Sequence, residues 1–308
     1  MIRVKFQAMG CSMVALLDHE GPQASKMLEK VPGWFEEWEQ VLSRFRPDSG
    51  LNRLNRSEGK YFLAEPTLIN VIQAALNEAS WTGGLVVPTI RKSLEIAGYD
   101  RDFDLVSPVQ PGKQTTSKTF DLPDWRQIKV DEDNQSIFLP AGSTLDLGGF
   151  AKGWAAQQAM QRLREIGPAI MDAGGDIAIS GPQADGQPWL VDIADPLQVQ
   201  ENLDMLALEG CGVATSGIDH RRWLQGDVVK HHIIDPRSGE TAKTDISSVT
   251  VIAADVIRAE AAAKAVLILG SQQGLEWLEE RPEVCGLLAL QDGQLLYSHG
   301  IQKYLWSD

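Results

Sequence analysis

The sequence predicts an α+β fold in which mixed or antiparallel sheets are flanked by helices. Segments with helical spacing and segments with strand-like alternation are interspersed along the 308 residues, without the regular alternation of a doubly wound parallel sheet. Hydrophobic residues make up 43% of the chain and charged residues 23%, which are values typical of a globular protein with a large core. We therefore expect a single domain over residues 1–308, or two closely packed α+β lobes.

Apolar spacing, together with the positions of proline and glycine, defines the elements of the N-terminal half. Strands alternate with a period of two residues, helices repeat every three to four, and loops concentrate Pro, Gly, Ser and Thr. The elements expected are, in order, a strand over 6–17 interrupted at 8–10, a helix over 24–42 with a kink or break at Pro32-Gly33, a helix over 67–80 and an exposed loop over 104–127.

The same reasoning defines the C-terminal half, where short strands dominate. An Asp-Gly pair between two apolar runs is a typical hairpin turn. The elements expected are a strand pair over 136–147, a helix from Gly153 to about residue 166, short strands on each side of Gly174-Gly175, strands over 189–194 and 247–253, a helix over 256–269, and a hairpin over 283–298 with Asp292-Gly293 at its turn.

Charge and composition exclude several classes of partner. The chain has 42 acidic and 28 basic residues, a net charge of -14, which disfavours nucleic acid and anionic membranes as partners. No apolar run approaches the length of a membrane span, and the first residues lack the apolar stretch of a signal peptide. Cys11, Cys211 and Cys285 have no metal-binding spacing and are expected to be buried or half-buried thiols. These features together predict a cytoplasmic protein.

A glycine-rich segment over residues 146–153, Asp-Leu-Gly-Gly-Phe-Ala-Lys-Gly, joins a strand to a helix. Backbone N–H groups at such a helix start favour an anion, and Lys152 adds a positive charge. The spacing fits neither a Walker loop nor a Rossmann fingerprint. The segment is therefore either an anion-binding turn or an ordinary strand-to-helix turn with a surface lysine.

Three other segments have both a chemical and a structural interpretation. Residues 173–176, Ala-Gly-Gly-Asp, form either a turn that lets a flat ligand approach or a plain hairpin turn. A hydroxyl pair at 215–216 precedes His232 and Asp235, so His232 is a candidate general base or a polar residue at a strand edge. Glu260 and Lys264 are spaced i,i+4 on one helix face, which by itself predicts a surface ion pair.

Seven segments in a fixed order resemble the motifs of the ApbE-type FAD:protein FMN transferase family. The resemblance covers the chain from about residue 5 to 300, and it implies the ApbE-like, T-fold-related α+β architecture. The segments are 6–10, 43–55, 146–153, 173–176, 214–217, 232–239 and 259–270.

The resemblance implies that FAD is the substrate. FAD is split at its pyrophosphate with the help of Mg²⁺, AMP leaves, and FMN passes to a Thr or Ser hydroxyl of an acceptor flavoprotein. His232 resembles the base that takes the hydroxyl proton, with Asp235 orienting that region. The FAD contacts that the resemblance implies are Met9, Phe45, Leu85, Val86, Val87, Asp146, Lys152, Ser216, Gly217 and Ile234.

The implied metal site departs from the family pattern. Gly149 would offer its backbone carbonyl, but Glu260 replaces an aspartate and Lys264 replaces a threonine. Val86 and Val87 also stand where the family has an aromatic residue and a carboxylate. An ammonium has no electron pair for Mg²⁺, so we expect Lys264 to take the place of the metal, paired with Glu260, and to contact the pyrophosphate.

These departures leave four functions open. The chain is an FMN transferase, a non-catalytic FAD-binding homologue, an FAD hydrolase, or a scaffold that no longer binds flavin. We expect it to act as a monomer or homodimer, since no long apolar stripe predicts an obligate coiled-coil partner.

Overall fold

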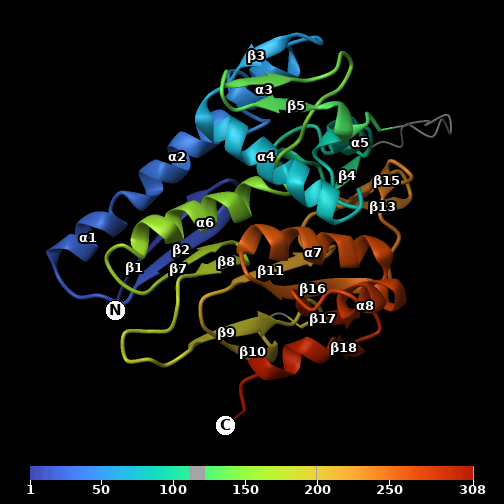
Figure 1. Ribbon diagram of the computed structural model, residues 1–308. Coiled ribbons are helices and arrows are strands. Elements are labelled where there is room, and N and C mark those ends of the chain that lie inside the picture. The colour runs from blue at the N-terminus through green and yellow to red at the C-terminus, as the bar shows by residue number, and fades with distance from the viewer. Residues whose placement is uncertain (111–121, 199, 308) are drawn as a thin grey trace. The chain divides into compact units, whose positions relative to one another are not determined.

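The computed structural model describes residues 1–110, 122–198 and 200–307. The chain divides into two compact units, which Figure 1 lets the reader follow along the sequence. Unit 1 consists of Met1–Glu37, Lys152–Gly217 and Thr244–Asp308, and unit 2 of Trp38–Ala151 and Ile218–Lys243. Helices α2 (Val31–Leu42) and α6 (Ala151–Leu163) each contain a boundary between the units.

Unit 1 is built on one eight-stranded sheet. Every pair of neighbouring strands in it is antiparallel. In spatial order the strands are β1 (Ile2–Ala8), β2 (Cys11–Leu17), β7 (Ala169–Ala173), β8 (Asp176–Ile179), β11 (Gly212–Gly217), β16 (Ile246–Ala253), β17 (Cys285–Leu290) and β18 (Leu295–Tyr297).

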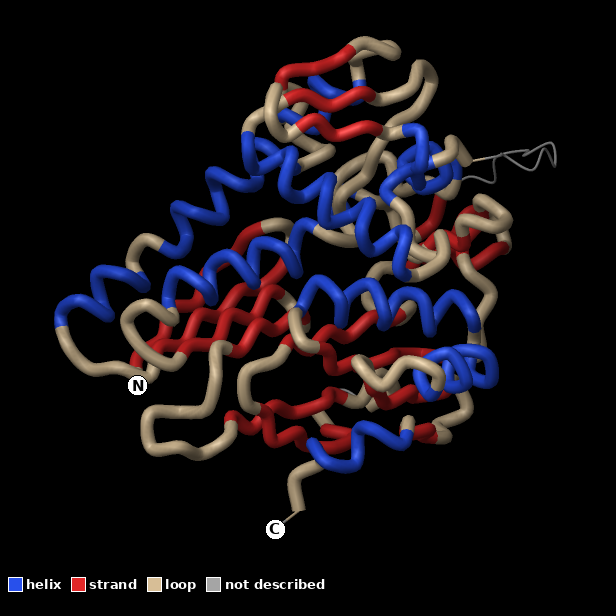
Figure 2. The backbone as a smooth tube through the Cα atoms, in the orientation of Figure 1, coloured by secondary structure: helices blue, strands red, loops and turns tan. Residues whose placement is uncertain are grey.

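The two faces of this sheet are covered differently. Helix α7 (Val256–Leu269) packs on β11 and β16, and Figure 2 shows α6 beside it on the same face. The opposite face holds an apolar cluster with the ribbon of β9 (Trp189–Ala194) and β10 (Asn202–Leu208) and the 3₁₀ segment η4 (His299–Tyr304). Helices α1 (Pro22–Leu28) and α8 (Ser271–Glu279) complete the unit. Strands β16 and β17 are thus buried on both faces, whereas the edge strand β1 has exposed residues.

Helix α7 has clear start and stop signals. The Asp255 side chain caps its N-terminus by accepting a hydrogen bond from Arg258 N–H, and Gly270, with a φ of 81°, ends it. Its alanines, of which Ala259, Ala262 and Ala263 are fully buried, let the helix approach the sheet closely. This close packing positions the Glu260 and Lys264 side chains of the same helix.

Unit 2 holds shorter elements around small sheets. One core cluster of this unit consists of Leu94, Ala97, Tyr99, Trp223 and Ile234. The helical segments are α3 (Gly50–Asn55), α4 (Pro66–Trp81), η1 (Pro88–Ile90), α5 (Arg91–Ile96), η2 (Phe103–Leu105) and η3 (Trp125–Gln127). The sheets are β3–β6–β5 (Tyr61–Leu63, Ser136–Phe138, Lys129–Asp131), β13–β12–β4 (Val228–His231, Arg222–Gln225, Val109–Gln110) and β14–β15 (Ile234–Asp235, Glu240–Thr241).

Most expected elements are present, and the α+β class is confirmed. The interrupted strand at the N-terminus is the β1–β2 hairpin, the expected helices over 67–80 and 256–269 are α4 and α7, and the final hairpin is β17–β18. The Gly174-Gly175 turn separates β7 from β8. Residues 189–194 and 247–253 are strands as expected.

Three expectations need correction. The break in the first helical region falls at Glu29-Lys30, because Pro32 lies in the first turn of α2, where a proline is tolerated. The expected strand pair over 136–147 is wrong: β6 is its sole strand, and it pairs with β3 and β5 instead. The expected loop over 104–127 contains β4, η3 and the end of η2, and residues 111–121 lie outside the described part.

Two further expectations concern burial and the membrane. Cys211 and Cys285 are buried thiols and Cys11 is half-buried, as expected. Among the described residues, no helix combines the length and the apolar character that crossing a bilayer requires.

Candidate active site

Four charged side chains from three elements meet in unit 1. Lys152 is the second residue of α6, Asp176 opens β8, and Glu260 and Lys264 lie one turn apart on α7. Lys152 Nζ forms an ion pair with Asp176 and lies 3.7 Å from Glu260 Oε1. Lys264 Nζ donates a hydrogen bond of 2.9 Å to the same Glu260 oxygen. Signs therefore alternate from Asp176 through Lys152 and Glu260 to Lys264, and we call these four residues the charged cluster.

The carboxylates of the charged cluster are more deeply buried than its lysines. The side chains of Asp176 and Glu260 are 2% and 1% exposed, against 16% for Lys152 and 14% for Lys264. Burying a charge is costly unless an opposite charge and hydrogen bonds compensate it. Each carboxylate here has an ammonium in contact with it, which explains how unit 1 tolerates them.

Burial and mutual contact shift the pKa values in the charged cluster. Burial raises the pKa of Asp176 to about 6; the Glu260 charge reinforces this shift, and the two lysines oppose it. Burial alone would raise the pKa of Glu260, but Lys264, Lys152 and the Gly153 N–H outweigh it and lower that pKa. Burial opposes the charged form of Lys152, yet Asp176 and Glu260 raise its pKa. Glu260 is thus the firmly ionised carboxylate, held between two cations.

Gly153 is the point where α6 approaches α7. Its backbone N–H donates a hydrogen bond of 3.2 Å to Glu260 Oε2. A Cβ at this position would lie 2.6 Å from that oxygen and 3.3 Å from the Val256 carbonyl, so the contact requires glycine. The glycine-rich segment therefore directs this N–H at the protein's own carboxylate.

Whether Glu260 and Lys264 can hold the implied Mg²⁺ depends on the atoms that they offer as ligands. Mg²⁺ requires oxygen ligands at about 2.0–2.1 Å in near-octahedral arrangement. Lys264 has no electron pair to give, and its ammonium is hydrogen-bonded to Glu260 Oε1, the oxygen that also lies near Lys152. Glu260 Oε2 already accepts the Gly153 N–H. Glu260 and Lys264 therefore do not fit a Mg²⁺ site.

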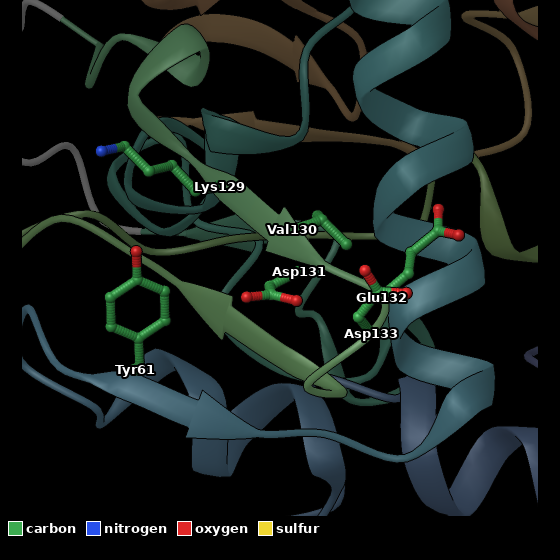
Figure 3. Close-up of a pocket in the computed structure, with 6 residues that line it drawn as sticks. All are labelled: Tyr61, Lys129, Val130, Asp131, Glu132 and Asp133. Atoms are coloured by element: carbon green, nitrogen blue, oxygen red, sulfur yellow. The ribbon is translucent and has the colours of Figure 1, made fainter.

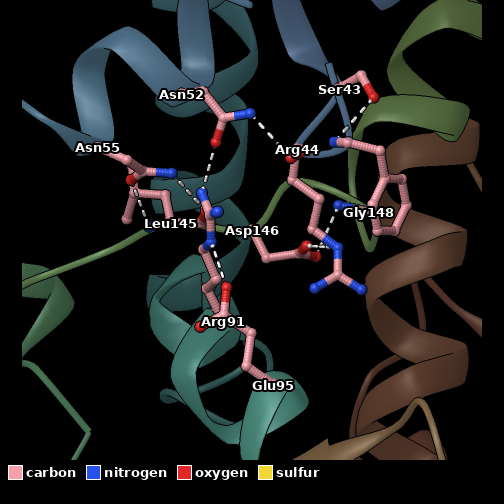
Figure 4. A network of polar contacts seen from close by, with 10 residues as sticks. Ser43, Arg44, Asn52, Asn55, Arg91, Glu95, Leu145, Asp146 and Gly148 are labelled. Carbon is pink, nitrogen blue, oxygen red and sulfur yellow. Dashed lines mark hydrogen bonds and ion pairs between the residues drawn. The ribbon is translucent and has the colours of Figure 1, made fainter. Parts of the chain in front are cut away.

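A second arrangement of predicted residues lies in unit 2, around Arg44 (Figure 4). Arg44 Nε contacts Asp146 Oδ2 at 3.0 Å, and Asp146 Oδ1 accepts the Gly148 N–H at 2.9 Å. The Arg44 guanidinium lies 4.5 Å from the centre of the Phe45 ring and 4.3 Å from that of Tyr99. Asp146 and Phe45, both predicted FAD contacts, are thus linked by Arg44, which the sequence did not single out.

Tyr99 connects this arrangement to Ile234. Tyr99 and Ile234 belong to the core cluster of unit 2, with Trp223, whose Nε1–H donates to the Ala97 carbonyl at 2.8 Å. Burial raises the pKa of Tyr99, although Arg221 and Arg44 oppose this. Ile234, a predicted FAD contact, therefore packs in the same aromatic cluster that contacts Arg44.

The three predicted contacts Leu85, Val86 and Val87 precede Pro88, whose carbonyl accepts the Asp146 N–H at 2.8 Å. This bond holds the segment next to Asp146. Val86 and Val87 are 6% and 4% exposed, while Leu85 is half-buried. The two valines thus act as core residues here.

The predicted base lies beside a structural histidine. His232 is half-buried at the bend between β13 and β14. Its neighbour His231 is buried and bonds to the Ala242 carbonyl at 2.9 Å through Nε2. Asp235, predicted to orient this region, is bonded through both carboxylate oxygens to the Arg237 side chain, within the β14–β15 turn. The carboxylate of Asp235 thus holds the turn that follows His232.

The remaining predicted site residues lie in turns and on strand β11. Met9, with a φ of 49°, is in the β1–β2 turn. Ser216 is buried on β11 opposite Val249, and Gly217 ends that strand. Gly149 lies in the turn before α6. By unit, Met9, Lys152, Ser216, Gly217, Glu260 and Lys264 are in unit 1, and Phe45, Leu85, Val86, Val87, Asp146, Gly149, His232, Ile234 and Asp235 are in unit 2.

An open hollow of about 530 Å³ lies elsewhere in unit 2, on the β3–β6–β5 sheet (Figure 3). Its lining residues are Tyr61, Lys129, Val130, Asp131, Glu132 and Asp133. Both Asp131 oxygens accept hydrogen bonds from Asn134, which explains the acidic turn as a structural feature. None of the predicted site residues lines this hollow.

Comparisons with known proteins agree with the resemblance seen in the sequence. The chain is 30% identical over 295 residues to an FAD:protein FMN transferase of Treponema pallidum, covering 89% of this chain and 80% of that protein. The ApbE protein of Thermotoga maritima has the same fold, with a TM-score of 0.87, 24% identity and 99% of both chains covered. The flavinyl transferase ApbE of Pseudomonas stutzeri gives a TM-score of 0.82 at 20% identity, over 100% of this chain and 97% of that one. The sequence profile of the ApbE family matches residues 8–288, and the chain therefore belongs to the ApbE family.

Proposed function

We propose that this chain is an FAD:protein FMN transferase. A Thr or Ser hydroxyl of an acceptor flavoprotein attacks the FMN phosphorus of FAD. A new P–O bond forms to the hydroxyl oxygen, the P–O bond to AMP breaks, AMP takes the electron pair, and the hydroxyl proton goes to a base. The match to the ApbE family over residues 8–288, with 30% identity to a protein of that activity, carries the proposal.

The chain supplies groups suited to each part of this reaction. Lys152 and Lys264 offer positive charge to the pyrophosphate, whose negative charge grows on the leaving AMP. His232 takes the proton of the attacking hydroxyl, a role that a neutral imidazole performs near neutral pH. Phe45, which is 36% exposed and packs against Tyr99, offers an apolar surface to FAD, and Ile234 is buried in the cluster that contains Tyr99.

The finer features of the setting are part of the same proposal. The acceptor presents a Thr or Ser in a cytoplasmic protein, since three thiols without a metal-binding spacing suit a reducing compartment. The transferase acts as a monomer or homodimer. Mg²⁺ has no assigned role in this chain, because Glu260 and Lys264 do not fit it.

A non-catalytic FAD-binding protein is the second candidate function. The observation that favours it is the Lys264–Glu260 hydrogen bond at the position where the family resemblance implies a metal ligand. The burial of Val86 and Val87, where the family has an aromatic residue and a carboxylate, points the same way. A protein of this kind binds FAD without releasing AMP.

One assay separates these functions. Purified protein is incubated with FAD and a Thr-containing acceptor domain, with Mg²⁺ in one series and EDTA in the other, while AMP is measured by chromatography and flavin by acceptor fluorescence. A transferase gives AMP and a fluorescent acceptor in equal amounts. AMP without a labelled acceptor indicates a hydrolase, and bound FAD without AMP indicates the non-catalytic protein.

Two histidine variants assign the base. His232→Ala should lose about 10²–10⁴-fold in transfer rate while still binding FAD. His220→Ala is the matched control, because His220 is an exposed histidine of the same unit, with 93% of its side chain accessible. Equal rates for the two variants would remove His232 from the mechanism.

A further inference from the structure

The Glu260 carboxylate has nitrogen partners on both oxygens. Oε1 is 2.9 Å from Lys264 Nζ and 3.7 Å from Lys152 Nζ, and Oε2 accepts the Gly153 N–H at 3.2 Å. A divalent ion bound to Oε1 would lie beside two ammonium groups, and like charges so close repel strongly at a buried site. Any metal at Glu260 must therefore first displace Lys264.

Lys264 is held at this position by the helix itself. Residues four apart on a helix share one face, and Glu260 and Lys264 both lie within α7. The ammonium is attached to the chain, whereas a bound metal ion exchanges with solvent. The Lys264 ammonium therefore lies beside the Glu260 carboxylate at any metal concentration.

The lysines are also the accessible members of the charged cluster. Within the described residues 1–110, 122–198 and 200–307, Lys264 Nζ donates one hydrogen bond, to Glu260. An ammonium has three N–H donors, so two remain for a ligand. The side chains of Lys264 and Lys152 are 14% and 16% exposed, while those of both carboxylates are almost fully covered. A ligand that reaches the cluster therefore meets cations first, which suits phosphate oxygens.

We propose that Lys264 is a built-in cation that replaces a divalent ion at Glu260, and that Lys264 and Lys152 bind the diphosphate of a flavin nucleotide without Mg²⁺. The identity of the ligand rests on the proposed function, whereas the exclusion of the divalent ion rests on the charged cluster alone. A lysine contacts phosphate as a point charge and does not reproduce the octahedral geometry of Mg²⁺.

The first test measures divalent-ion binding directly. Mn²⁺, a paramagnetic substitute for Mg²⁺, is titrated into wild type, the double variant Glu260→Asp/Lys264→Thr, and the control Lys26→Thr, and bound ion is followed by electron paramagnetic resonance. Lys26 is an exposed lysine of α1, so its variant makes the same charge change on a helix away from the cluster. Circular dichroism checks that each variant is folded.

The expected result is one new Mn²⁺ site in the double variant, absent from wild type and from Lys26→Thr. A site of equal affinity in all three proteins, or no gain in a folded double variant, would overturn the proposal. If the double variant does not fold, the wild-type protein still decides, because a tight Mn²⁺ site that Mg²⁺ displaces would contradict the account of Lys264.

The second test measures FAD affinity by isothermal titration calorimetry, with Mg²⁺ and with EDTA. Wild type should bind FAD with the same Kd within about twofold under both conditions, and Lys264→Met should weaken binding about tenfold in EDTA, as expected for a lost charged hydrogen bond. An FAD affinity that EDTA abolishes in wild type would overturn the proposal.

The two tests also separate this proposal from the proposed function. FAD binding that is insensitive to EDTA, together with no AMP or labelled acceptor, would leave Lys264 as the cation and refute the transferase. AMP and a labelled acceptor that appear only with Mg²⁺ would leave the transferase and refute the built-in cation. Gain of Mg²⁺-dependent FAD cleavage by the double variant would support both.

Discussion

His231 illustrates how a single buried side chain fixes its own protonation state. Its Nε2 faces the Ala242 carbonyl, which only accepts, and its Nδ1 faces the Ile233 N–H, which only donates. The ring is therefore the neutral tautomer with the proton on Nε2. Burial lowers the pKa of His231 from its ordinary value of 6.5, and the charge of Lys230 acts in the same direction.

This arrangement predicts a pH dependence of stability. The unfolded chain takes up a proton at a higher pH than the folded one, so the free energy of unfolding falls as pH is lowered from about 6.5 toward the folded pKa. His231→Gln should reduce that loss and cost about 1–2 kcal/mol at pH 7.5 through the two hydrogen bonds. Urea denaturation at several pH values checks this.

The control for this prediction is His220→Gln. It removes a histidine whose side chain is 93% exposed and leaves both His231 bonds intact. The slope of stability against pH below 6.5 should therefore change in the His231 variant alone. The same change in both variants would show that His231 does not cause it.

The cysteines differ in their expected reactivity. Burial raises the pKa of Cys211 to about 12 and that of Cys285 to about 11, so at pH 8 the reactive thiolate is less than about one part in a thousand of either. Cys11 is half-buried in β2. Iodoacetamide at pH 8, followed by mass spectrometry, should label Cys11 first and the other two at the rate of unfolding. Early labelling of Cys211 would contradict this packing.

For single residues, the sequence predicted contacts within one helix better than contacts between separate elements. The i,i+4 spacing predicted the Glu260–Lys264 contact, because both residues lie on one helix, but it predicted a surface pair, whereas the Glu260 side chain is 1% exposed. It did not predict Asp176 as the partner of Lys152, since strand β8 and helix α6 are brought together by the fold. The one signal for Asp176 was a carboxylate at the start of an apolar run, next to two glycines.

Among the elements, the packing of β11 against α7 depends on one glycine. A Cβ on Gly212 would lie 2.0 Å from Val256 N and 2.4 Å from Val256 Cα, and backbone atoms cannot move aside as a side chain can. Gly212→Ala should therefore destabilise the protein by about 3 kcal/mol or more.

Gly33 provides the matched comparison. It is exposed within α2, and a Cβ there meets nothing within 4 Å. Gly33→Ala should stabilise by about 0.5–1 kcal/mol, because alanine loses less backbone entropy in a helix. Urea denaturation of both variants should give changes of opposite sign. A loss of stability in both variants would mean that the space available to the new Cβ does not determine the change in stability.

Element prediction succeeded where local signals and tertiary packing agree. Helix α4 follows from Pro66 at its start and from its apolar face, both of which are local. The strand pair expected over 136–147 failed because β6 pairs with β3, more than 70 residues earlier in the sequence, and with β5. The predicted helix break at Pro32-Gly33 is wrong because Pro32 lies in the first turn of α2, where a proline does not interrupt the helix.

For the molecule as a whole, the order of the chain makes the fold dependent on distant pairings. Each unit is assembled from separate segments, three in unit 1 and two in unit 2. Strand β2 pairs with β7, so that Met13 faces Ala173 across 160 residues of sequence. Such non-local pairing carries a high loop-closure cost and predicts slow folding. It also means that the charged cluster depends on both later segments of unit 1, because Lys152 and Asp176 come from one segment and Glu260 and Lys264 from the next.

The sheet of unit 1 predicts how stability is distributed over the molecule. All eight residues of β16 are buried, and the strand is paired with β11 on one side and β17 on the other. Strand β18 is a three-residue edge strand paired on one side. An amide proton exchanges through the opening of lowest free energy that exposes it, and central strands open only when the whole fold unfolds.

Hydrogen exchange followed by mass spectrometry should therefore show the slowest exchange in peptides from β16, with an opening free energy equal to the global free energy of unfolding. Peptides covering β18 should exchange by local opening at much lower cost. Gly212→Ala, which weakens the β11–α7 contact, should lower β16 protection by the amount it lowers global stability. Fast exchange of β16 at unchanged global stability would mean that this sheet opens separately from the rest of the chain.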